Sequence, residues 1–146
     1  MCGIAGVIHR GKASGVGAEM TSMLQALKHR GPDSTGFAVY GTPTEAQYVM
    51  RFKVAEQEDM ASGFDIHGQV KARIEEVDKR LEERGANVKA REQCTAYALR
   101  YVLTYEADME ELARYIEDVE GAEILSMGTG LELIKDLGDA TLVSDQ

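Results

Sequence analysis

Cys2 is the residue whose position in the chain gives it chemistry. When Met1 is removed, Cys2 becomes the first residue and carries both a thiol and a free α-amino group. An α-amino group has an ordinary pKa of about 7.7, so at neutral pH it can act as general base for the thiol beside it. The position therefore predicts a nucleophilic cysteine. The alternative is a small apolar residue packed at the start of a strand, which is the common role of a single cysteine.

A second segment with potential for chemistry covers residues 29–36 and reads HRGPDSTG. Its two glycines and its proline predict a turn or an irregular loop. Arg30 and Asp33 could hold such a loop by bonding to each other and to backbone groups, or they could contact a substrate. Near Cys2, Gly3 and Gly6 would let another backbone approach, either that of a substrate or that of a neighbouring strand.

The start MCGIAG, a helix, and then residues 29–36 together resemble the class II glutamine amidotransferases, the amino-terminal-nucleophile family that includes asparagine synthetase and glutamate synthase. The resemblance covers residues 1 to about 41. It implies that glutamine is the substrate and that Cys2 forms a γ-glutamyl thioester with it. The released ammonia then passes through a sheltered channel to a synthase partner. It also implies that Arg30, Gly31 and Asp33 bind the substrate or support the site.

Later in the chain the match is one of arrangement. A β-α-β-β-α-β unit inserted before a Met-Gly-x-Gly segment resembles the stand-alone amidotransferase subunits of archaeal-type glutamate synthase and N-methylglutamate synthase. Three parts of the family pattern have no counterpart: an arginine segment for the glutamine carboxylate, an Asn-Gly pair for the oxyanion, and an aspartate for the glutamine amine. The single asparagine, Asn87, is followed by Val88. Because lost oxyanion donors alone cost ~10²-fold or more in rate, we expect little glutaminase activity from this chain alone.

The composition excludes several classes of function. A formal net charge of -9 and a pI of about 4.8 argue against nucleic acid as a partner, since phosphate binding needs clustered Lys and Arg. The sequence has no apolar run of the length that a membrane span requires. Two cysteines and no secretory signal favour the cytoplasm. Cys94 is expected to pack, and the three histidines, His9, His29 and His67, share no metal-ligand spacing, so we expect neither a metal nor a cofactor in this chain.

The elements that must position Cys2 come first in the chain. Residues 2–8 form a short apolar run that predicts a buried strand. A helix is expected to follow Gly15–Gly17 and to end near Lys28, because apolar residues recur at helical spacing: Met20, Met23, Leu24 and Leu27. Residues 37–40 predict a second strand.

Residues 48–127 predict a β-α-β-β-α-β order, which is the split, ferredoxin-like pattern. Strands are expected at 48–54, 86–92, 95–105 and 122–127. The third has the clearest alternation, with Tyr97, Leu99, Tyr101, Leu103 and Tyr105 on one face. A helix with apolar residues from Ile66 to Leu81 should end at Gly85, and a second helix should begin at Asp108.

The last part of the chain offers one weak motif. Gly128-Thr129-Gly130 before an expected helix at 131–137 is similar to a phosphate-binding loop, but it lacks the lysine and the spacing of such loops, so ordinary helix capping is the favoured interpretation. After Gly138 no closing helix is expected, and the chain looks cut short.

These expectations combine into an α/β (α+β) architecture: a partial amino-terminal-nucleophile amidotransferase fold with an inserted ferredoxin-like unit. The expected domains are residues 1–45, the amidotransferase start, residues 46–128, the insertion, and residues 129–146, the return to the first domain. Two other functions fit Cys2 or the insertion. One is a hydrolase of the same nucleophile type that acts on another amide, and the other is a non-catalytic ligand-binding or assembly module.

Overall fold

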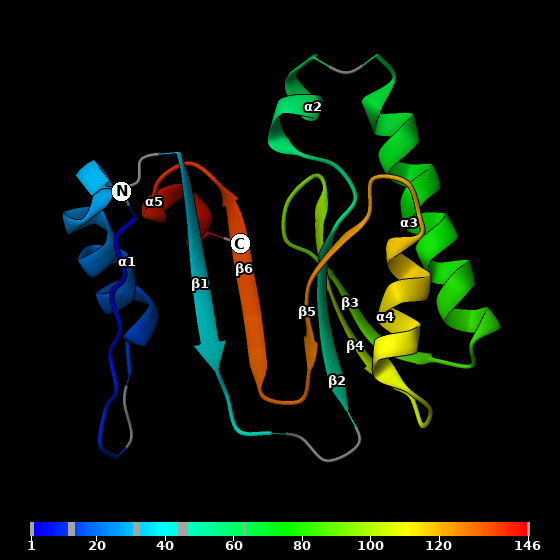
Figure 1. Ribbon diagram of the computed structural model, residues 1–146, viewed down its shortest axis with the longest axis horizontal. Coiled ribbons are helices and arrows are strands. Elements are labelled where there is room, and N and C mark those ends of the chain that lie inside the picture. Colours follow the sequence, from blue (N-terminus) through cyan, green and yellow to red (C-terminus); the bar gives the residue numbers. More distant parts are fainter. Residues whose placement is uncertain (1, 12–13, 31–32, 44–46, 63, 146) are drawn as a thin grey trace. The chain divides into compact units, whose positions relative to one another are not determined.

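A computed structural model describes residues 2–11, 14–30, 33–43, 47–62 and 64–145 of the chain (Figure 1). The chain divides into two compact units: Met1–Phe37 with Ile134–Gln146, and Ala38–Leu133. Both contain helices and strands, and the paired strands of the larger sheet are antiparallel. The expected α+β fold class is confirmed.

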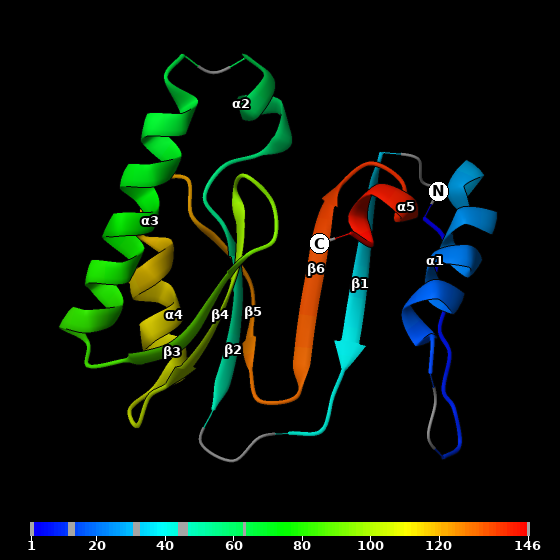
Figure 2. The same cartoon turned by 180° about the vertical axis from the view of Figure 1, so that it is seen from behind.

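The 38–133 unit contains the predicted order of elements. It runs through β2 (Tyr48–Lys53), α2 (Gln57–Ser62), α3 (Ile66–Glu83), β3 (Asn87–Gln93), β4 (Ala98–Thr104), α4 (Met109–Glu117) and β5 (Glu123–Gly128). The sheet order is β3-β4-β2-β5, so the first and third strands of the unit lie at its centre. This is the order of the split βαβ pattern. Figure 2 shows α3 and α4 side by side along the sheet.

The core of this unit follows from period-two alternation in the strands. Met50 and Phe52 on β2 and Tyr101 and Leu103 on β4 are almost completely buried, and they meet apolar residues of both helices, Val70, Val77, Leu81, Leu112 and Ile116. The rings of Phe52 and Tyr101 pack edge to face, with centroids 5.0 Å apart. Full burial of each such side chain contributes about 1.5–3 kcal/mol.

Local signals set the helix boundaries. After α3 the chain turns at Gly85, whose φ of 76° favours glycine, and the N–H groups of Gly85 and Ala86 donate to Glu82 and Leu81. Asp108 caps α4, because its carboxylate accepts from the backbone N–H groups of Glu110 and Glu111. Both ends are where the sequence predicts them.

Lys53 is a buried charged residue at the end of β2, only 4% exposed. Its Nζ lies 2.7 and 2.8 Å from the carboxylate oxygens of Glu56 and 3.5 Å from Glu123. A lysine can be buried when its ammonium is paired in this way.

The second unit is built from α1 (Val16–Ala26), the 3-10 helix η1 (Lys28–Arg30), β1 (Ser34–Tyr40), β6 (Leu131–Leu137) and α5 (Ala140–Val143). β1 and β6 form a two-stranded sheet, and both strands continue into the 38–133 unit. The predicted helix near residues 15–28 is confirmed. Among the described residues of α1, none is fully buried.

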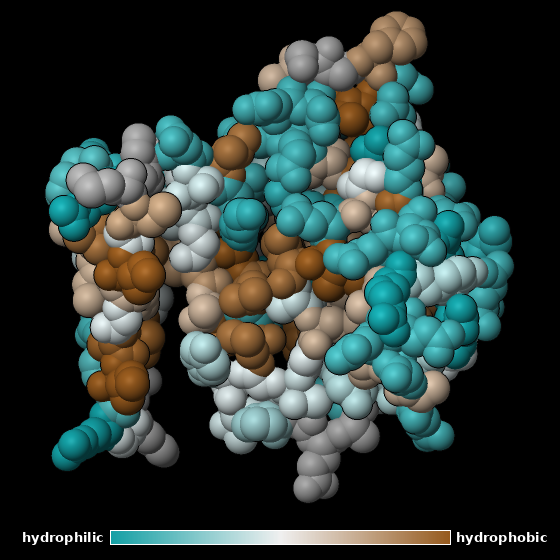
Figure 3. Space-filling model, in the orientation of Figure 1, coloured by the Kyte–Doolittle hydropathy of each residue, from teal (hydrophilic) through white to brown (hydrophobic). Residues whose placement is uncertain are grey.

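Residues 2–8 are not a buried strand, contrary to the prediction. They belong to neither sheet, and the side chains of Ile4 and Ile8 are exposed, at 94% and 96%. A strand needs a hydrogen-bonded neighbour as well as an apolar sequence, and β1 and β6 pair with each other instead. Figure 3 shows apolar surface over this segment and α1.

Three further expectations near the ends of this unit are wrong. Residues 131–137 form strand β6 and not a helix, so Gly128-Thr129-Gly130 does not precede a helix N-terminus that could bind phosphate. β1 already begins at Ser34, inside the segment expected as a loop. A helix, α5, does follow Gly138, with Asp139 as its N-cap.

Candidate functional site

Cys2 lies exposed with a free thiol, on the segment that leads to α1. Its neighbour Gly3 packs against the end of α1 and against η1. A Cβ placed on Gly3 would lie 3.2 Å from Cβ of Leu27 and 3.7 Å from Cβ of Arg30. Since 3.2 Å is tighter than ordinary contact, the absence of a side chain at Gly3 lets the cysteine-bearing segment approach the helix end. Gly6, by contrast, has nothing within 4 Å.

Arg30 and Asp33 lie on either side of residues that are not described. Arg30 is exposed in η1, and its backbone N–H donates to the carbonyl of Leu27 at 2.8 Å. Asp33 is exposed, and its carbonyl accepts from the N–H of Gly138 at 3.2 Å. No ion pair joins these two side chains, both of which the structure describes. Of the other predicted positions, Gly31 and Met1 lie outside the described residues.

A hollow of about 90 Å³ adjoins Gly3 within the same unit. Its wall combines apolar residues of α1 with polar residues from the start of β1 and of α5: Gly3, Leu24, Leu27, Lys28, Ser34, Thr35, Gly36, Asp139 and Ala140. Sites for small molecules usually measure about 300–1,000 Å³. The hollow alone can therefore take the end of a side chain, and not a whole amino acid.

Thr35 and Asp139 fix the polar wall of this hollow. Thr35 Oγ1 donates to the carbonyl of Gly138 at 2.8 Å, which joins β1 to the end of β6. The carboxylate of Asp139 accepts from the N–H groups of Thr141 and Leu142 at 3.0 and 3.2 Å. Hydrogen bonding from Gln25, and then from these two N–H groups, lowers the pKa of Asp139. Asp139 therefore presents a fixed negative charge beside Lys28.

Sequence reasoning singled out neither Thr35 nor Asp139. A signal for Asp139 exists, because an Asp directly before the apolar ATLV is an N-cap pattern. The signal is weak, because a helix of four residues has too short an apolar pattern to be recognised in the sequence. Thr35 has no such signal, since its position depends on the pairing of β1 with β6.

Cys94, the second cysteine, lies half-buried at the end of β3. Its Sγ accepts from Nη1 of Arg51 at 3.6 Å. Burial raises the pKa of the Cys94 thiol despite the nearby guanidinium. A thiol that stays protonated is a weak nucleophile, so this environment favours the predicted packing role.

A metal site would need several His, Cys, Asp or Glu side chains close together. Within the described ranges no group of three or more His, Cys, Asp or Glu residues is placed to do so. His9 instead contacts Glu19, with Nε2 2.7 Å from the carboxylate. None of the helices in the described part of the chain is long and apolar enough to cross a membrane.

Comparison with known proteins gives one informative match. No protein-family model matches the chain. A curated protein of Methanothermobacter thermautotrophicus, named "Putative glutamine amidotransferase", is 33% identical over 149 residues. The match covers 100% of this chain and 46% of the relative, so the chain spans about half of the relative's length. The chain is thus similar to one part of a protein named as a glutamine amidotransferase.

Proposed function

We propose that this chain carries the nucleophile of a class II glutamine amidotransferase. The observation that supports this most is the packing of Gly3, which follows Cys2, against Leu27 and against Arg30, the second residue of the HRGPDSTG segment. The two motifs of the family resemblance, residues 1–6 and 29–36, thereby meet in one unit. The similarity to a protein named as a glutamine amidotransferase supports the same substrate.

The proposed reaction begins with proton transfer from the Cys2 thiol to its own α-amino group. The sulfur then attacks the side-chain amide carbon of glutamine, forming a carbon–sulfur bond. When the tetrahedral intermediate collapses, the carbon–nitrogen bond breaks and the proton passes to the leaving ammonia. Water next attacks the thioester, so that glutamate leaves and the thiol is restored. The sum is glutamine plus water giving glutamate plus ammonia.

Full activity in this proposal requires catalytic and binding groups in addition to those that the described residues supply. A tetrahedral intermediate needs donors directed at its oxyanion, and the charged end of glutamine needs fixed partners. The hollow of about 90 Å³ beside Gly3 is too small to supply both. The ammonia would pass to a synthase-type partner, for which a glutamate synthase-like subunit is our proposal.

Labelling with a diazoketone analogue of glutamine tests the proposal. We expect slow labelling of the chain alone and fast labelling, at Cys2 only, when the unmatched half of the Methanothermobacter thermautotrophicus relative is supplied with it. Excess glutamine should protect the thiol. Cys2→Ala should abolish labelling, whereas the matched variant Cys94→Ala should not change it. Labelling that glutamine does not slow, or that moves to Cys94, would contradict the proposal.

A hydrolase of another amide is distinguished by substrate. It would share Cys2 and its free amine, but it would release product to solvent and would not need glutamine. If glutamine fails to protect Cys2 while another amide protects it, this alternative replaces the proposal.

A further inference from the structure

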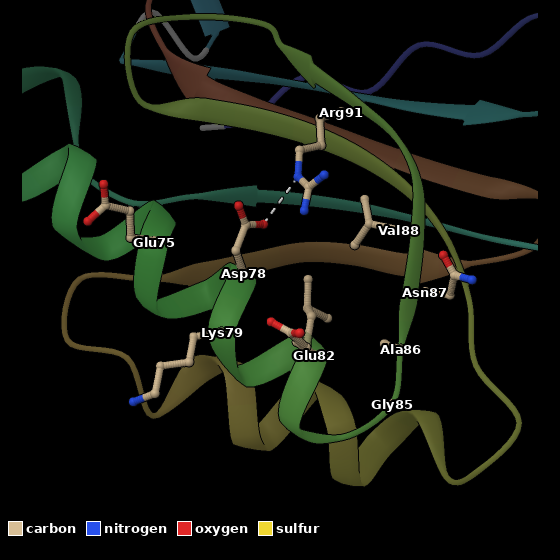
Figure 4. Close-up of a pocket in the computed structure, with 10 residues that line it drawn as sticks. Glu75, Asp78, Lys79, Glu82, Gly85, Ala86, Asn87, Val88 and Arg91 are labelled. Carbon is tan, nitrogen blue, oxygen red and sulfur yellow. Dashed lines mark hydrogen bonds and ion pairs between the residues drawn. The ribbon is translucent and has the colours of Figure 1, made fainter.

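The α3–β3 hollow is a cavity of about 570 Å³ at the edge of the 38–133 unit, between the second half of α3 and β3 (Figure 4). Its volume lies within the usual range for small-molecule sites, about 300–1,000 Å³. Charged side chains of both signs line it around an apolar floor: Glu75, Asp78, Glu82, Arg91, Leu81 and Val88. A site with this lining suits a ligand that itself carries both charges.

Arg91 provides the positive side. It reaches from β3 over the hollow toward α3, where its Nε lies 3.3 Å from a carboxylate oxygen of Asp78. Its guanidinium carbon is 5.4 Å from the centre of the Tyr101 ring, and this cation–π contact helps to hold the group in place. A guanidinium has five N–H donors, so the bond to Asp78 leaves capacity for a second carboxylate.

The negative side is a stripe on α3. Glu75, Asp78 and Glu82 are spaced i, i+3 and i+7, which places them on one helix face. Two members of this stripe have cationic partners, since Glu75 lies 3.9 Å from Nζ of Lys71 and Asp78 pairs with Arg91. Lys79 also lines the hollow, but it is directed away from β3 and pairs with Glu76 and Glu83. Among the described residues, Glu82 has no ion-pair partner.

A second copy of the chain, added at the exposed edge of β3, is the competing occupant. Two-fold antiparallel pairing centred on Ala90 would put Lys89 of one copy opposite Arg91 of the other. Pairing centred on Lys89 would put the two copies of Lys89 opposite each other, and pairing centred on Arg91 would do the same for Arg91. Like charges directly opposite are destabilising. The register of β3 also shifts between Val88 and Ala90, and such irregularities protect edges from pairing. The edge therefore disfavours a further strand as the occupant.

We propose that the α3–β3 hollow binds a small zwitterion of the α-amino acid class. The ligand carboxylate bonds to Arg91, its ammonium lies between Asp78 and Glu82, and its side chain covers Val88. The ammonium offsets the competition between Asp78 and the ligand carboxylate for Arg91, since it gives Asp78 a new partner. This inference is independent of the proposed function at Cys2.

Titration of the 146-residue chain, monitored residue by residue by ¹H–¹⁵N NMR, tests the proposal. The Cys2→Ala variant is used so that no covalent chemistry occurs. With L-leucine, L-glutamine or L-glutamate we expect saturable shifts centred on Glu82, Val88 and Arg91. Leucine without its carboxylate (3-methylbutylamine) and without its amine (4-methylpentanoate) should each bind at least ~10-fold more weakly, because each loses charge-assisted bonds.

Variants distinguish binding at the α3–β3 hollow from a general effect of surface charge on the NMR shifts. Arg91→Met and Glu82→Gln should each weaken binding by at least ~10-fold. Lys89→Met, on the same strand but outside the hollow, and Glu106→Gln should leave it unchanged. Glu82 is exposed, so its variant keeps the fold even if Arg91→Met does not. The proposal is overturned if none of the three amino acids gives saturable shifts, if the two analogues bind as well as leucine, or if Glu82→Gln binds normally.

Discussion

The two units of the chain differ in how completely they bury their apolar side chains. The 38–133 unit has a continuous core in which strands and helices cover each other. In the other unit the buried apolar residues among those described are Ala140 and Val143, while Ile4, Ile8 and Leu142 are mostly exposed. Cys2, the residue with the proposed chemistry, lies in the less complete unit. Stability and chemistry are therefore assigned to different parts of the chain, and each assignment can be tested separately.

The largest expected effect is a difference in independent folding. Residues 38–133 expressed alone should melt cooperatively, because they include the complete core and the whole four-stranded sheet. Circular dichroism during heating measures this. A gradual change without a transition would show that the core depends on the rest of the chain.

Truncation of one leucine in each unit sharpens the comparison. Leu103→Ala removes a fully buried side chain and should destabilise the protein by about 2–5 kcal/mol. Leu142→Ala, on the exposed face of α5, should change stability by less than about 0.5 kcal/mol. Urea unfolding of both variants gives the two values. Equal effects would remove the distinction between the units.

The sequence predicts the 38–133 unit more completely than the other unit. Tyr97, Leu99, Tyr101 and Leu103 predict their strand because alternation is local and both central strands have partners nearby. Residues 2–8 and 131–137 are predicted wrongly because pairing with a distant strand, and not local pattern, decides their structure. In the second case Leu131, Ile134 and Leu137 happen to recur at helical spacing.

For the candidate site, the sequence identifies Cys2 and the segment around Arg30 through motif and resemblance. It does not identify Thr35 or Asp139, which reach the hollow only because β6 returns beside β1. Long-range pairing of this kind leaves no trace in the spacing of single residues. The packing of Gly3 on Leu27 is likewise visible only in three dimensions.

Glu132 gives an effect of intermediate size with a defined pH dependence. Its carboxylate accepts from Arg51 at 2.7 Å and from Arg100 at 2.8 and 2.9 Å. The Arg100 hydrogen bonds, followed by that of Arg51, outweigh burial and lower the pKa of Glu132 to about 2. The Glu132→Gln variant should lose about 2 kcal/mol at neutral pH.

The sign of the pH dependence follows from linkage. Because the pKa of Glu132 is lower in the folded state than its ordinary value of 4.5, its contribution is complete above that value. The contribution disappears as the pH falls from about 4.5 through about 2. Urea unfolding between pH 6 and pH 2 should therefore show a steeper loss of stability for the unchanged protein than for Glu132→Gln. Parallel curves would contradict the ion-pair network.

Effects smaller than that of Glu132→Gln are expected from the two helix caps. Asp108→Ala removes the cap of the nine-residue α4, which covers the core, and should cost about 1 kcal/mol. Asp139→Ala removes the cap of the four-residue α5 and should leave the melt of the 38–133 core unchanged. Differential scanning calorimetry compares the two. A lower transition temperature for Asp139→Ala would link α5 to that core.

The central claim, that Cys2 acts as an amino-terminal nucleophile, depends on one covalent fact. A thiol that uses its own α-amino group as base cannot do so behind a methionine. Intact-mass spectrometry of the protein purified after ordinary expression measures this most directly. We predict a single species that lacks the mass of Met1 and begins at Cys2. A mature chain that retains Met1 would contradict the mechanism, whatever its other properties.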